Sequence, residues 1–200
     1  MSADRAGVIE PHAVILVEGM SDQAALEALA GRRGQALDAD GISITAMGGA
    51  TNIERFVGRF GPHGLDVRLA GLCDVAEEGH FRRALERAGL GSGLSRTGME
   101  ALGFFVCIAD LEDELIRALG TDAVERVIEA QGELRSFRVF QRQPAQQGRS
   151  RRQQLRRFMG TRSGRKSLYA RLLVDALDLG RVPRPLDQVL THAADGRNGL

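Results

Sequence analysis

The 200-residue sequence has few cysteines, a single lysine and no long apolar run. Its two cysteines, Cys73 and Cys107, lie inside apolar segments and fit no zinc-binding spacing, so we expect buried free thiols rather than disulfides or a zinc site. No apolar run approaches the roughly 18 residues that a membrane-spanning helix needs. No basic segment followed by an apolar stretch opens the chain. We therefore expect a cytoplasmic protein with no membrane partner.

Charge is balanced overall but unevenly distributed along the chain. There are 27 basic and 26 acidic residues, and every basic residue except Lys166 is an arginine. Residues 134–174 hold 12 of the basic residues and no acid, which leaves 15 basic and 26 acidic residues elsewhere. Such a cationic segment indicates contact with nucleic-acid phosphates, although a charge run can also be a solvated face. The arginines expected to contact DNA are Arg149, Arg151, Arg152, Arg156, Arg157, Arg162 and Arg165.

Short apolar runs alternate with helix-like stretches over residues 13–131. The runs predict strands over 13–17, 42–47, 67–73 and 104–109. The stretches between and after them predict helices over 21–30, 52–60, 77–88, 112–119 and 123–131, with two more over 155–159 and 167–177. This alternation is typical of a parallel sheet with helices on both faces. We therefore expect an α/β fold built on a mainly parallel four-stranded sheet.

Two polar or glycine-rich stretches and a pair of prolines interrupt this pattern. Residues 89–98 are predicted to be a flexible loop and residues 141–154 a mobile polar segment, and Pro183 and Pro185 are expected to end regular structure. We divide the chain into an α/β core over residues 1–133 and a helical, Arg-rich extension over residues 134–200. We expect this extension to carry Lys166 and to pack on the core.

Acidic residues follow three of the four predicted strands. Glu18 ends the first strand and Asp22 comes four residues later; Asp74 ends the third, with Glu78 close behind, and Glu112 follows the fourth. Ligands bind at the carboxyl ends of strands in open parallel sheets, and crowded carboxylates attract hard cations such as Mg²⁺ or Mn²⁺. The pattern favours metal-assisted phosphoryl transfer, although each acid could instead cap the helix that follows it.

The segments VEGMSD, LCD and DLEDEL resemble, in this order, the motifs of the TOPRIM domain shared by topoisomerases, primases and related nucleases. The likeness is greatest to the TOPRIM portion of the overcoming-lysogenisation-defect (OLD) family of ATP-dependent endonucleases, and it covers about residues 12–175. The resemblance implies a Rossmann-like TOPRIM fold with a C-terminal helical, Arg-rich extension. It also implies an endonuclease that cuts DNA with Mg²⁺ or Mn²⁺.

The resemblance also implies roles for particular residues. Glu18 would be a metal ligand or an acid–base residue, and Asp22, Asp74 and Glu112 would be metal ligands. Lys166 resembles the late lysine of the family, which contacts the scissile phosphate or stabilises its developing charge. Its retention in an arginine-dominated chain fits a need for a compact, strongly hydrated charge, although a single lysine could also remain by chance.

Two departures from the family pattern bear on activity. The second aspartate of the family's Asp-x-Asp pair is replaced by Ala76, which leaves Glu77 or Glu78 to substitute for it. The chain has no G-x-x-x-x-G-K-[ST] phosphate loop, so any ATP dependence would require a separate ATPase subunit. Whether the chain is an enzyme therefore stays open. The alternatives to a nuclease are a catalytically weak module that binds DNA or a partner ATPase, and another nucleotidyl or phosphoryl transfer on the same fold.

Overall fold

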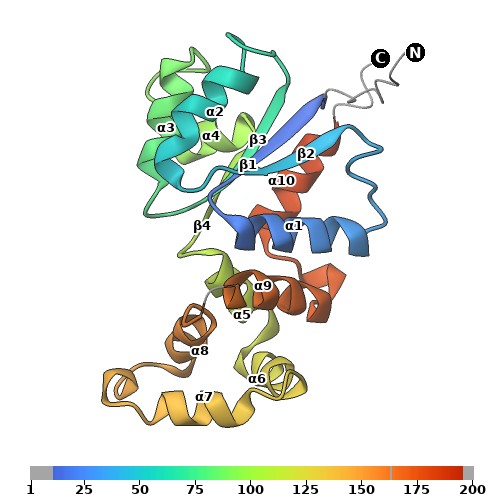
Figure 1. Ribbon diagram of the computed structural model, residues 1–200. Helices are drawn as coiled ribbons and strands as arrows, with labels where there is room; N and C mark the ends of the chain where they lie inside the picture. The colour runs from blue at the N-terminus through green and yellow to red at the C-terminus, as the bar shows by residue number, and fades with distance from the viewer. Residues whose placement is uncertain (1–10, 163, 196–200) are drawn as a thin grey trace, which may run out of the picture.

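A sheet of four parallel strands forms the centre of the computed structural model, which describes residues 11–162 and 164–195. The strand order is β2-β1-β3-β4 (Figure 1). Each strand matches its predicted range to within two residues at either end, and the α/β fold with a parallel four-stranded sheet is confirmed. The strands are β1 (Ala13–Val17), β2 (Ile42–Ala46), β3 (Arg68–Asp74) and β4 (Phe104–Cys107).

Helices cover both faces of the sheet because successive residues of each strand point to opposite sides. Ala13, Ile15 and Val17 of β1 face one apolar core, and Val14 and Leu16 face the other. The first core lies under α1 and α10 and the second under three shorter helices (Figure 1). These helices are α1 (Met20–Arg32) and α10 (Arg184–Ala194) on one face, and α2 (Ile53–Phe60), α3 (Glu78–Arg87) and α4 (Arg96–Ala101) on the other.

Gly71 allows β3 to pack closely against its neighbours. A Cβ atom at this position would lie 2.5 Å from the ring of Phe104 and 3.2 Å from the carbonyl oxygen of Leu16. Only a residue without a side chain fits there unless the Phe104 ring moves. The glycine therefore lets the aromatic ring of β4 lie directly over the central strand.

The two cysteines are free and buried, as expected. Cys73 belongs to the core beneath α2, α3 and α4, whereas Cys107 belongs to the core beneath α1 and α10. Burial raises the pKa of both thiols, with nearby carboxylates such as Asp74 adding to the effect. Both thiols are therefore protonated and unreactive while the core stays closed.

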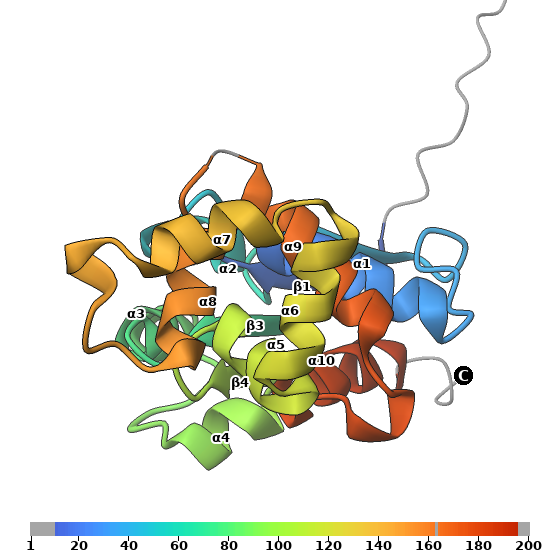
Figure 2. The same ribbon diagram turned by 90° about the horizontal axis from the view of Figure 1, so that it is seen from below.

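Of the α-helices that follow β4, all but α10 lie beyond the carboxyl ends of the strands (Figures 1 and 2). Residues from α6, α7, α8 and α9, among them Ile128, Phe137, Phe158 and Tyr169, belong to the same apolar core as α1. Helix α9 packs along α1 and α5, so this helical part and the sheet share one core. The helices are α5 (Leu111–Leu119), α6 (Thr121–Ala130), α7 (Leu134–Gln141), α8 (Arg151–Met159) and α9 (Arg165–Ala176). The division of the chain after residue 133 stays a prediction.

The structure differs from the expected irregular segments in three places. Pro183 and Pro185 begin α10 instead of ending regular structure, because proline lacks the N–H that the first helical turn leaves unpaired. The polar stretch 141–154 contains a short 3₁₀ turn and the start of α8, where Ser150 and Gln153 form a reciprocal capping box. The glycine-rich loop ends early, since Ser95 caps α4 through the N–H of Gly98.

None of the helices in residues 11–162 and 164–195 combines the length and apolar character that a bilayer span requires.

Candidate functional site

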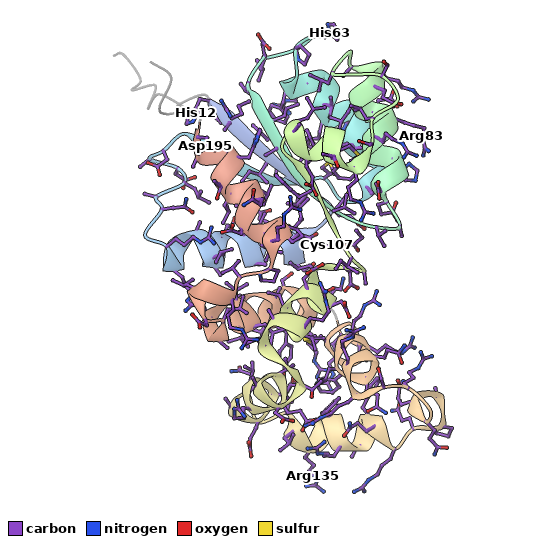
Figure 3. The ribbon with its side chains drawn as sticks, turned by 180° about the vertical axis from the view of Figure 1, so that it is seen from behind. His12, His63, Arg83, Cys107, Arg135 and Asp195 are labelled. Carbon is purple, nitrogen blue, oxygen red and sulfur yellow. The ribbon has the colours of Figure 1, made fainter. Side chains whose placement is uncertain are left out.

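The carboxyl ends of β1 and β3 lie at the point where the strand order reverses. The chain passes from β1 to β2 on one side and then to β3 on the other, and crevices at such switch points bind ligands in α/β proteins. Val17 is paired in register with Leu72, and Asp74 is paired with Cys107. Glu18, next after Val17, and Asp74 therefore leave the sheet close together. Cys107, labelled in Figure 3, marks this edge at the end of β4.

A pocket of about 410 Å³ opens at this edge, and we call it the carboxylate pocket. Five predicted site residues line it, although they are spread over almost 150 positions of the chain. They are Glu18, Asp22, Asp74, Glu112 and Lys166. The rest of its lining comes from Gly19, Met20, Ser21, Gly48, Gly49, Leu111 and Ser167.

Two of the acids in the carboxylate pocket have identifiable partners. The carboxylate of Asp22, in the first turn of α1, accepts a hydrogen bond of 2.9 Å from the N–H of Gly19, the residue just before the helix. The Nζ of Lys166 lies 3.2 Å from Oε2 of Glu112, whose side chain is only 1% exposed. Oε1 of Glu112 is buried and has no hydrogen-bond partner among the described residues. Buried polar atoms nearly always have a hydrogen-bond or metal partner, so this oxygen has room for a ligand that the protein itself does not supply.

Three acids of the carboxylate pocket, Asp22, Asp74 and Glu112, have a raised pKa, chiefly because they are buried and also because other carboxylates lie nearby. Burial raises the pKa of Asp74 to about 7, and the neighbouring carboxylates of Asp22 and Asp110 add to the effect. Burial raises the pKa of Asp22 to about 6 despite the hydrogen bond from Gly19. The pKa of Glu112 is also raised by burial, which outweighs the attraction of Lys166. For Lys166, burial lowers the pKa, but the Glu112 carboxylate more than offsets this and holds the ammonium charged.

The chemistry of this donor set fits a hard divalent cation. Four carboxylates face one ammonium, and the free Oε1 of Glu112 is an oxygen ligand without a competing partner. Within residues 11–162 and 164–195, however, no three His, Cys, Asp or Glu side chains are already grouped closely enough to hold a metal ion. The chemistry of the donor set thus fits the cation, whereas the spacing of the described side chains does not form a ready-made site.

Glu78 lies outside the carboxylate pocket. Its carboxylate accepts a hydrogen bond from Arg96, and Glu77 lies 3.7 Å from the imidazole of His80. Neither side chain takes the place of the missing aspartate at Ala76 in this structure. The role of Glu78 as a metal ligand stays an untested prediction, and its ion pair with Arg96 argues against it.

Three of the arginines expected to contact DNA are paired with acids instead. Nη1 of Arg151 lies 2.6 Å from Asp122, and its Nε lies 2.5 Å from Glu125. Arg152 lies 3.1 Å from Asp113, and Arg156 is paired with Asp110. These contacts join α8 to α5 and α6, so a large part of the cationic segment balances charge within the protein.

Arg165 is a buried residue and not a surface cation. Its side chain is 5% exposed and donates hydrogen bonds to Glu133, at 2.6 Å, and to Thr161, at 2.7 Å. The hydroxyl of Tyr169 donates to the same Glu133 carboxylate at 2.6 Å. This network holds the first turn of α9, the turn that carries Lys166. We therefore remove Arg165 from the proposed DNA contacts.

Arg149, Arg157 and Arg162 are exposed and have no ion pair with a carboxylate of the described residues. Arg149 and Arg157 also line a second pocket, next to the carboxylate pocket, whereas Arg162 does not. Ser167 lines the carboxylate pocket without having been predicted as a site residue, whereas Gly48 and Gly49 belong to a strand-to-helix turn whose sequence fits a phosphate site and a simple tight turn equally well. Gly49 has φ of 127°, a conformation that favours glycine, so its backbone can lie at the pocket wall.

Comparison with known proteins supports the expected resemblance. Residues 12–75 match the family model of the overcoming lysogenization defect protein-like TOPRIM domain. The structure is similar to the C-terminal region of the Burkholderia pseudomallei OLD protein, with 22% identity, a TM-score of 0.71 and coverage of 93% of this chain and 98% of that one. It is also similar to the C-terminal region of the Xanthomonas campestris pv. campestris OLD protein, with 26% identity, a TM-score of 0.68 and coverage of 93% and 96%.

A search of curated proteins gave no significant match. The fold is therefore that of OLD C-terminal regions, and the OLD-like TOPRIM resemblance is confirmed over residues 12–75.

Proposed function

We propose, on the premise of an OLD-like TOPRIM fold, that this chain is a divalent-metal-dependent nuclease domain that hydrolyses phosphodiester bonds of DNA. One observation carries the proposal: Glu18, Asp22, Asp74 and Glu112 converge with the single lysine, Lys166, on one pocket at the switch point of the sheet. These are the positions to which the family resemblance assigns catalysis and metal binding.

The acids would hold Mg²⁺ or Mn²⁺, which acts as a Lewis acid and lowers the pKa of bound water. Glu18 lines the carboxylate pocket, where its carboxylate would accept a proton from the attacking water. Lys166 offsets the negative charge that develops on the phosphate. The ion pair with Glu112 keeps that ammonium charged and fixes its place in the pocket.

DNA would be held beside this site by the exposed cations Arg149, Arg157 and Arg162. The sequence contains no phosphate loop of the Walker type. ATP dependence, where the OLD family has it, would thus come to this chain from a separate ATPase partner.

A second candidate function is a catalytically weak module that binds DNA or a partner ATPase. It is favoured by the alanine at position 76 together with the Arg96–Glu78 ion pair, which leaves one ligand position of the family pattern unfilled. Calorimetric titration separates the two candidates. Binding of Mg²⁺ or Mn²⁺ that is lost in Asp74→Asn supports the nuclease, and no binding at millimolar metal supports the weak module.

The nuclease proposal is tested by nicking of supercoiled DNA in the presence of Mg²⁺ or Mn²⁺. We expect Glu18→Ala and Lys166→Ala to lower the rate by about 100-fold or more, the usual effect of removing an acid–base or charge-stabilising group. Glu129→Ala, which removes an exposed acid of α6, is the matched control and should leave the rate unchanged. Nicking by Glu18→Ala at the wild-type rate would contradict the proposal.

A further inference from the structure

A second pocket, of about 350 Å³, adjoins the carboxylate pocket between α5, α8 and α9. It shares Glu112 and Lys166 with the carboxylate pocket, so these two side chains form a common wall. We call it the arginine pocket. Its lining residues are Asp110, Glu112, Arg149, Gln153, Arg156, Arg157 and Lys166.

Charge in the arginine pocket is opposite to that of its neighbour. Four cations and two carboxylates line it. Asp110 is paired with Arg156, and Glu112 is paired with Lys166. The guanidinium groups of Arg149 and Arg157 remain without an ion pair among the described residues, so the pocket carries an excess of positive charge. Two such groups are suited to a single phosphodiester, which accepts charge-assisted hydrogen bonds from guanidinium donors.

The arginines reach this pocket because of their spacing on and before α8. Arg149 precedes the Ser150 cap, and Gln153, Arg156 and Arg157 follow at intervals that place them on one side of the helix. The Nε of Arg149 donates to the carbonyl of Ala145 at 3.0 Å, which fixes the side chain and leaves its terminal nitrogens free. The ion pairs of Arg151, Arg152 and Arg156 hold α8 against α5 and α6. These ion pairs thus hold the wall of the arginine pocket in place, and Arg149 and Arg157 are left to bind a ligand.

We infer that the arginine pocket binds one backbone phosphate of the nucleic acid, next to the phosphate held over the carboxylate pocket, with Arg149 and Arg157 as its ligands. This inference rests on the proposed function for the identity of the ligand. Because the two pockets share Glu112 and Lys166, a strand with one phosphate over the carboxylate pocket would present a neighbouring phosphate to the arginine pocket. The arginine pocket would therefore set how the strand lies across the site.

Binding of a fluorescent oligonucleotide tests the pocket without cleavage. Ca²⁺ replaces Mg²⁺ as a hard cation with the same oxygen ligands. We expect the double variant Arg149→Ala/Arg157→Ala to bind on the order of tenfold more weakly, and the slope of log K against log salt to become shallower by roughly 1 to 2. The control is Arg135→Ala, in the same cationic segment on α7, where the side chain points away from the rest of the molecule (Figure 3).

Arg135→Ala should change affinity by less than about twofold. Equal losses in the double variant and in Arg135→Ala would overturn the inference, as would wild-type affinity in the double variant. All three arginines are exposed, so unchanged melting curves should show that the variants are folded.

Cleavage of oligonucleotides with one neutral methylphosphonate in place of a phosphate locates the contact. For the wild-type protein, we expect kcat/KM to fall when the methylphosphonate replaces one particular phosphate beside the cleaved bond. For Arg149→Ala/Arg157→Ala, the same substitution should lower kcat/KM no further, because the contact is already lost, as a double-mutant cycle requires. The same loss at every position in both proteins would contradict the inference. If the wild-type protein cleaves nothing, the nuclease proposal fails, while binding in Ca²⁺ still decides the role of the arginine pocket.

Discussion

Asp22 and Asp74 hold protons at pH values where an aspartate is normally ionised. Burial raises the pKa of Asp22 from 3.8 to about 6 and that of Asp74 from 3.8 to about 7. In the pH range between 3.8 and these raised values, the two aspartates bind more protons in the folded state than in the unfolded state. The free energy of unfolding of the metal-free protein should therefore fall as the pH rises from about 4 to about 7, and it should be level above that range.

Asp74→Asn tests this at the level of one residue. It removes the ionised carboxylate from beside Asp22, so we expect metal-free stability at pH 8 to rise by about 1–2 kcal/mol, allowing for solvent screening of a partly exposed group. Little change is expected at pH 4, where the aspartate is largely protonated in the folded state. Denaturant unfolding in EDTA measures both values, with the exposed Asp38→Asn as control. A loss of stability at pH 8 would contradict the burial argument.

The site residues show which single-residue roles a sequence can predict. Glu18, Asp74 and Glu112 were recognisable because each follows a buried strand, and topology alone brings such positions together. Arg165 was misassigned because its partner, Glu133, lies 32 residues away and no local pattern identifies the pair. In sequence, a buried arginine in a basic segment is indistinguishable from an exposed one.

At the scale of elements, the fit of β3 against β4 depends on Gly71. Gly71→Ala places a methyl group against the Phe104 ring, and we expect a loss of about 1–3 kcal/mol in the free energy of unfolding. Gly31→Ala in α1 is the matched control, since a Cβ there meets nothing within 4 Å. It should stabilise the protein by roughly 0.5–1 kcal/mol through helix propensity. Chemical denaturation measures the free energy of unfolding of both variants, which should fall in Gly71→Ala and rise in Gly31→Ala.

Glu125 links three helices of the part beyond the sheet. Its carboxylate, on α6, accepts hydrogen bonds from Arg138 of α7 and Arg151 of α8, and its side chain is only 8% exposed. Glu125→Ala should cost about 1–3 kcal/mol because two arginines lose a buried partner. Hydrogen exchange should accelerate in α7 and α8 before it does in the strands. Asp122→Ala removes an acid that is 76% exposed and should cost less than about 0.5 kcal/mol.

The sheet was easier to predict than the helices beyond it. Strands such as Ala13–Val17 are apolar throughout, because both faces of the sheet are covered, and this pattern survives in the sequence. Helix α7 was missed because its apolar residues lie within a polar, arginine-rich background. The start of α10 was missed because proline is common both in the first turn of a helix and just after a helix ends. Only the residues on either side of the proline distinguish the two cases.

At the scale of the whole molecule, the cationic segment is half neutralised. Six of its twelve cations form ion pairs with carboxylates: Arg138, Arg151, Arg152, Arg156, Arg165 and Lys166. Lys166 also acts on a phosphate in the proposed function, so at most seven cations of the segment are available to DNA, and we expect a plot of log K against log salt to have a slope no steeper than roughly −6 on double-stranded DNA. Twelve free cations would give roughly −11. Affinities measured between about 50 and about 200 mM salt decide between these values.

The placement of the two cysteines provides a pair of native kinetic reporters. Cys73 and Cys107 lie on adjacent strands but in cores on opposite faces of the sheet. Because a buried thiol with a raised pKa reacts only after its surroundings open, the alkylation rate of each cysteine measures the opening of one half of the molecule. The core around Cys107 continues into the helices that carry Lys166 and the arginine pocket. Bound DNA should therefore slow labelling of Cys107 more than that of Cys73, and mass spectrometry can follow both on the unmodified chain.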